Sequence, residues 1–195
     1  MFKHASAEVK LPVTRWLIRG AFAGMVGGMA MAIYAMIASL TYQHHGFFTP
    51  LYHISALTGS PASMMMSMQQ AMSGHSFGFT PGAALVGLAI HMMTGATYGM
   101  MFAVVARYLG RATYIIVGAG YGLMVFILSS FVLLPVAASV SGAGDPIGHM
   151  ARIVGYETFA AEHLFFGVTL AAALLVLAPR SARVSATSTP VPVPA

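Results

Sequence analysis

The stretch that decides the fold is residues 112–138, ATYIIVGAGYGLMVFILSSFVLLPVAA, which contains no charged side chain. A helix needs about 20 apolar residues to cross the hydrocarbon core of a bilayer, and this stretch exceeds that length. Three more apolar segments of comparable length lie at 16–40, 81–108 and 157–179. The sequence therefore predicts an all-α integral membrane protein whose domain, residues 16–179, is a bundle of four transmembrane helices.

The composition supports a membrane protein independently. Charged residues make up 7% of the chain and hydrophobic residues 58%, whereas soluble domains carry about 25% charged residues. A soluble protein of 195 residues could not bury that much apolar surface. Cysteine is absent, which excludes disulfides, thiolate catalysis and cysteine-ligated metal sites.

The basic residues are concentrated in the segments that would share one side of a four-span protein. They are Lys3, Lys10, Arg15, Arg19, Arg107, Arg111, Arg180 and Arg183, with Arg152 as the exception. By the positive-inside rule, we expect both termini to be cytoplasmic. Residues 1–15 would form a cytoplasmic segment and residues 180–195 a disordered cytoplasmic tail. This distribution gives no indication of nucleic-acid binding.

The connection 42–80 should form a cap of short helices on the outer side of the membrane. Thr-Pro pairs at 49–50 and 80–81 are favourable helix openings, because Thr can accept free backbone N–H bonds and Pro fits the first helical position. We expect short helices over 49–57 and 61–73, followed by the second span.

Small residues recur at four-residue spacing within the spans, which keeps them on one helix face. Such faces let helix backbones approach closely in a membrane. We therefore predict helix packing through these glycines, inside the bundle, between copies of the chain or against another subunit: Gly20, Gly24, Gly28, Gly95, Gly99, Gly118, Gly122 and Gly167.

The order of these motifs suggests a duplicated helical hairpin. Spans one and three carry a G-x3-G motif, whereas spans two and four carry H-x3-G, beginning at His91 and His163. Two hairpins in the same orientation would be related by an axis along the membrane normal. In that arrangement His91 and His163 would be symmetry mates at similar depth.

His91, His163 and Glu162 are candidates for binding a metal or a haem. Ionisable groups inside a membrane are costly, so each invites a functional hypothesis. Two neutral imidazoles could ligate a b-type haem, or share a metal with the carboxylate. The structural alternative is that each histidine hydrogen-bonds to a neighbouring helix.

A Met-rich stretch in the outer connection is a second candidate. Met65, Met68 and Met72 share one face of a short helix, and His75 follows just after its end. Soft thioethers together with an imidazole suit Cu(I). The structural alternative is that these methionines are adaptable apolar packing against the membrane or a partner.

Four fragments carry a resemblance to a known family: RGAFAGMVGG (19–28), HMMTGATYGMMFAVVAR (91–107), GAGYGLMVFILSSFVLLP (118–135) and EHLFFGVTLAAALL (162–175). Together they resemble small four-helix bacterial inner-membrane proteins of the broad YagU-like type. The resemblance covers the four spans but not the Met/His-rich connection. It implies a bacterial plasma membrane, and it carries no function and no site residues.

The leading functional hypothesis is a non-catalytic accessory or structural subunit of a bacterial membrane protein complex. The sequence has no Walker loop, dinucleotide fingerprint, HExxH motif or nucleophile elbow. The first alternative is a membrane protein that binds copper or haem b through its outer-side His and Met residues. The second is a small transporter, against which no span carries a charged residue near its middle.

Overall fold

The computed structural model describes residues 12–177, and the regular elements in that range are helical. Four stretches are long and apolar enough to cross a membrane: α1 (Val13–Thr41), α4 (Pro81–Ala106), the continuous helical segment Arg111–Ser141, and α9 (Tyr156–Leu177). The chain is therefore an all-α, multi-pass membrane protein, and the four-helix fold predicted from the apolar segments is confirmed. The predicted tail, 180–195, and most of the predicted segment 1–15 lie outside the described residues.

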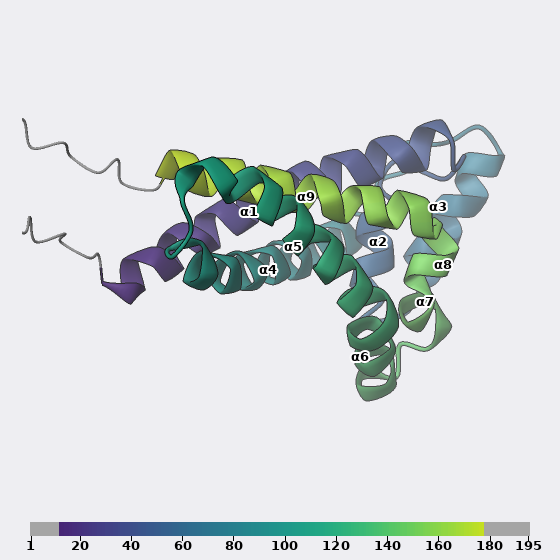
Figure 1. Cartoon of the computed structure of the whole chain (residues 1–195). Helices are drawn as coiled ribbons and strands as arrows, with labels where there is room; N and C mark the ends of the chain where they lie inside the picture. Colours follow the sequence, from purple (N-terminus) through teal and green to yellow (C-terminus); the bar gives the residue numbers. More distant parts are fainter. Residues whose placement is uncertain (1–11, 178–195) are drawn as a thin grey trace, which may run out of the picture.

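The third span changes its helix type along its length. It comprises η1 (Arg111–Thr113), α5 (Tyr114–Leu128), the π-helix η2 (Ser129–Leu133) and α6 (Leu134–Ser141). Pro135 lacks an N–H donor, and its ring would clash with the carbonyl four residues earlier in a regular α-helix. Proline and π-segments are recognised causes of kinks. In Figure 1, α6 accordingly leaves the bundle that α5 belongs to.

The long helices pack in the order α4, α1, α9, α5. α1 contacts both α4 and α9, and α9 contacts α5, whereas α4 and α5 share few contacts. α1 begins and α9 ends at the same end of the bundle, which we call the open end (Figure 1). Short helices gather at the opposite, capped end: α2 (Thr49–Ser55), α3 (Ala62–Met72), α7 (Asp145–Gly148) and α8 (Met150–Val154).

α1 and α4 approach until backbone meets backbone. A side-chain carbon at Gly24 would strike the carbonyl of Gly95, and one at Gly20 would strike the carbonyl of Gly99. The reverse also holds, since carbons on Gly95 and Gly99 would strike the carbonyls of Gly24 and Gly20. Close packing and Cα–H···O contacts of this kind stabilise helix pairs in lipid.

α5 and α9 repeat the same crossing. A carbon added to Gly118 would meet the Gly167 carbonyl, and one added to Gly122 would meet the His163 carbonyl and the Gly167 Cα. Gly118, Gly122 and Gly167 therefore occupy the places that Gly20, Gly24 and Gly99 hold in the first pair. The two hairpins, α1–α4 and α5–α9, therefore each contain a helix crossing of the same kind.

The match between the two crossings pairs different residues of α4 and α9 from those that the H-x3-G motifs paired. His163 takes the position of Gly95, and Phe159 takes the position of His91, so the two histidines are one helical turn out of correspondence. Accordingly, His91 hydrogen-bonds to the backbone of α1, whereas Phe159 packs against the ring of Phe126 at 6.2 Å. Backbone contact, and not the position of the H-x3-G motif, determines which residues of α4 and α9 correspond.

The cap forms where the Thr-Pro pairs predict it, but the threonines act differently. Pro50 and Pro81 lie in the first turns of α2 and α4 as expected. Neither threonine caps its helix through its side chain; the Thr49 hydroxyl pairs with that of Ser67 at 2.9 Å. The Tyr52 hydroxyl instead ties the cap to α4, accepting from the Thr80 N–H at 2.8 Å.

The glycine crossings yield a direct stability test. Replacing Gly24 or Gly122 with alanine places a methyl group against a facing backbone carbonyl, which should lower the free energy of unfolding by about 1–3 kcal/mol. Gly120 of α5 is the matched control, because an added carbon there meets nothing within 4 Å. Alanine at 120 should be neutral or stabilising, by up to about 1 kcal/mol.

Thermal unfolding of the purified variants in mild detergent measures the difference. If Gly24→Ala melts at the same temperature as Gly120→Ala, the α1 and α4 backbones are not in direct contact at Gly24.

Candidate functional site

A cavity of about 300 Å³ lies in the capped half of the bundle. Its walls come from α1, α4, α9 and the third span, and α2, α7 and α8 contribute residues at the capped end. At the inner end, the rings of Tyr98 and Phe166 pack at 6.5 Å, and the Tyr121 hydroxyl donates to the Tyr98 carbonyl at 2.8 Å. The space is left where α6 bends away and no longer faces α4.

Three of the residues singled out from the sequence line this cavity: His91, Glu162 and His163. The two histidines come from different hairpins and lie within electrostatic reach of each other. The structure therefore brings them to one site, although they are not symmetry mates. His53 of α2 and Gln43 also line the cavity, and the sequence did not single them out.

His53 and Gln43 could be recognised only through the fold of the cap. His53 bonds through Nε2 to the Pro146 carbonyl, and Gln43 donates through Nε2 to the Val154 carbonyl at 2.8 Å. Both partners are remote in sequence. The one local signal was the placement of His53 among Leu51, Tyr52 and Ile54, which marks a buried helix face.

The side chains of His53, His91 and His163 are each hydrogen-bonded to a backbone carbonyl. Nε2 of His91 lies 2.9 Å from the Gly28 carbonyl oxygen, and Nδ1 of His163 lies 2.7 Å from that of Phe159. A carbonyl oxygen can only accept, so the bonded nitrogen in each ring is the N–H donor. Since a neutral imidazole carries a single N–H, its other nitrogen is left as an acceptor.

Glu162 is a buried acidic residue of α9 that lines the cavity. It is 5% exposed, and its carboxyl has no hydrogen-bond or ion-pair partner among residues 12–177. Tyr34 of α1 lies within electrostatic reach of it. Burying a polar group without a partner is costly, and most buried polar groups in proteins are paired. The carboxyl thus faces a cavity while lacking a donor.

The metal-site hypotheses find no assembled ligand set in the part of the chain that the structure describes. Within residues 12–177, no group of three or more His, Cys, Asp or Glu side chains is placed to hold a metal ion. The Met-rich set is not part of the cavity lining. Met65, Met72 and His75 are exposed at the capped end, and Met68 packs half-buried against the α2–α4 contact. Copper binding there stays a separate prediction.

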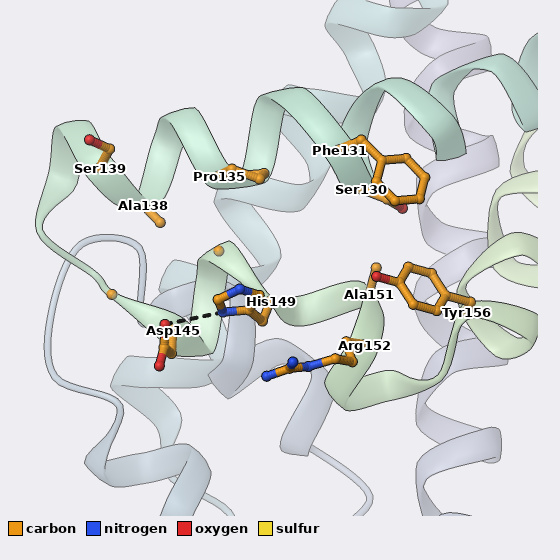
Figure 2. A pocket seen from close by; sticks show the side chains of 12 residues that line it. Ser130, Phe131, Pro135, Ala138, Ser139, Asp145, His149, Ala151, Arg152 and Tyr156 are labelled. Atoms are coloured by element: carbon orange, nitrogen blue, oxygen red, sulfur yellow. Dashed lines mark hydrogen bonds and ion pairs between the residues drawn. The ribbon is translucent and has the colours of Figure 1, made fainter.

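A second, more open pocket of about 430 Å³ lies between α6 and the α7–α8 segment (Figure 2). Asp145 and His149 form a 3.1 Å pair across one turn, drawn as the dashed line in Figure 2. Their side chains are 88% and 51% exposed, and such exposed pairs contribute little. Arg152 extends beside them from α8. The charged groups of this pocket are solvated, so the cavity lined by the buried side chains of Glu162 and His163 is the stronger candidate.

Comparison of the chain with protein-family models, with curated proteins and with solved structures finds no match in any of the three. The YagU-like resemblance accordingly stays a prediction.

His53 gives the cap a pH dependence. Burial lowers its pKa because the charged imidazolium loses hydration, and the hydrogen bond to Pro146 offsets part of this effect. The unfolded chain therefore takes up a proton at His53 near its ordinary pKa, about 6.5, before the folded protein does. The contribution of the neutral His53 ring to the free energy of unfolding is fully present above that pH. It is lost as the pH falls toward the pKa of His53 in the folded protein.

We expect the melting temperature to fall between pH 7 and pH 5, and to fall less steeply in His53→Gln. His75→Gln, in the same connection but exposed, is the matched control and should keep the wild-type slope. Equal slopes for wild type and His53→Gln would rule out a contribution from His53 burial.

Proposed function

We propose that this is a non-catalytic membrane protein that binds a small amphiphilic molecule in the cavity between its two hairpins. The observation that carries the proposal is Glu162, which is buried, has no hydrogen-bond or ion-pair partner within residues 12–177, and lines an otherwise largely apolar cavity. Ligand sites commonly have volumes of about 300–1,000 Å³, apolar walls and a few convergent polar groups. The cavity meets each of these criteria.

The hydrogen bonding favours binding over catalysis. The imidazoles of His53, His91 and His163 are bonded to backbone carbonyls. Among residues 12–177, no Ser, Thr or Tyr hydroxyl is hydrogen-bonded to any of the three. A nucleophile activated by histidine would need such a bond. The bonds to backbone carbonyls instead fix the orientation of the three rings in the cavity wall.

Membership of a larger complex is a separate proposal, and it needs a different surface from the one that the sequence suggested. The glycine faces of α1, α4, α5 and α9 are occupied within the chain. A partner subunit would have to contact the outward apolar faces, such as the side of α5 that exposes Gly120. We further propose that the open end faces the cytoplasm, because Arg19, Arg107 and Arg111 gather there.

Native mass spectrometry after mild extraction tests these proposals together. Wild type should carry a small-molecule adduct that Ala137→Phe loses, because Ala137 lines the cavity and a phenyl group fills part of it. Val136→Phe is the matched control, since Val136 is 55% exposed and does not line the cavity. It should keep the adduct.

Other masses would favour other hypotheses. A polypeptide adduct would establish a subunit role, and a mass matching haem or copper would return the metal hypotheses to first place. Wild type without a small-molecule adduct, or an adduct insensitive to Ala137→Phe, would remove the support for ligand binding in this cavity.

A further inference from the structure

The polar lining of the cavity consists mainly of hydrogen-bond acceptors. The N–H groups of His53, His91 and His163 are already given to backbone carbonyls, so each neutral ring has only a lone pair left to offer. Gln43 donates one of its two amide N–H groups to the Val154 carbonyl, and its side-chain oxygen is an acceptor. Thr94 donates to the carbonyl of Ile90 in its own helix at 2.9 Å.

Glu162 adds carboxyl oxygens to this set. None of the residues lining the cavity is Lys or Arg. The remaining hydroxyls, of Tyr98 and Ser129, can donate or accept. An anionic head group would therefore meet a carboxyl and several lone pairs, without a positive charge to offset them.

We propose that the ligand of this cavity bears a primary ammonium group on an apolar tail, with the ammonium bonded to Glu162 and to the free nitrogens of His91 and His163. This inference rests on the proposed function and gives its ligand a chemical class. An ammonium carries three N–H donors and no acceptor. Three acceptor groups from α4 and α9 are available to it, and the mostly apolar remainder of the wall suits the tail.

The energetics favour this class over a neutral alcohol. A charge-assisted hydrogen bond is roughly twice as strong as a neutral one, and a charge pair is strengthened among largely apolar walls, which offsets the hydration that the ammonium loses. A trimethylated ammonium keeps the charge but has no N–H to donate. It should therefore bind more weakly than the primary ammonium, which separates charge from hydrogen bonding.

The test uses the full-length protein in a non-ionic detergent with ligands of equal chain length: decylammonium, decyltrimethylammonium, decanol and decanoate. Binding is measured by native mass spectrometry and by the shift in melting temperature. We expect decylammonium to bind at least about tenfold more tightly than decanol, and decanoate to bind most weakly of the four. Ala137→Phe should abolish the binding, and Val136→Phe should not.

Glu162→Gln should remove the preference of decylammonium over decanol. The matched control is Glu157→Gln, on the same helix but exposed and outside the cavity, and it should keep the preference. The wild-type ligand series decides the question even if Glu162→Gln does not fold.

The outcomes separate the two proposals. If decanol or decanoate binds at least as tightly as decylammonium and Ala137→Phe abolishes that binding, the cavity binds a ligand but the ammonium inference is overturned. A preference retained in Glu162→Gln would overturn it as well. If Ala137→Phe affects none of the four ligands, the proposed function fails along with it.

Discussion

Direct backbone contact between glycine-bearing helices determines the arrangement of this protein. In lipid, no hydrophobic force draws apolar helices together, so close packing has to come from van der Waals contact. Gly20, Gly24 and Gly99 allow it in the first hairpin, and Gly118, Gly122 and Gly167 allow it in the second. The hairpins then join through α1 and α9.

That arrangement leaves α4 and α5 as the two helices without a tight mutual contact. Near the open end, Phe102 and Tyr121 fill the space between them, with ring centroids 5.1 Å apart. Toward the capped end, the π-helix and Pro135 turn the third span away, and the space stays open. The cavity thus follows from two tight crossings and one bend, and its polar side chains come from helices on both sides.

The sequence predicted what depends on local signals. Apolar length located the spans, and the Thr-Pro pairs at 49–50 and 80–81 located a short helix and the start of α4. Local signals did not predict which residues of the two hairpins correspond. The H-x3-G motif occurs on both α4 and α9 and matches His91 with His163, whereas the backbone contacts match Gly95 with His163. His53 was missed since its role depends on the carbonyl of Pro146, far along the chain.

The two hairpins use one mode of helix packing but contribute different side chains to the cavity. The two hairpins repeat the same glycine crossing, yet where one hairpin has His91 the other has Phe159, and where one has Gly95 the other has His163. Glu162 likewise stands on one side alone. Because the polar side chains are distributed unequally between the two hairpins, the two halves of the cavity wall differ in chemistry, and a ligand with two identical ends would find polar partners for one of them.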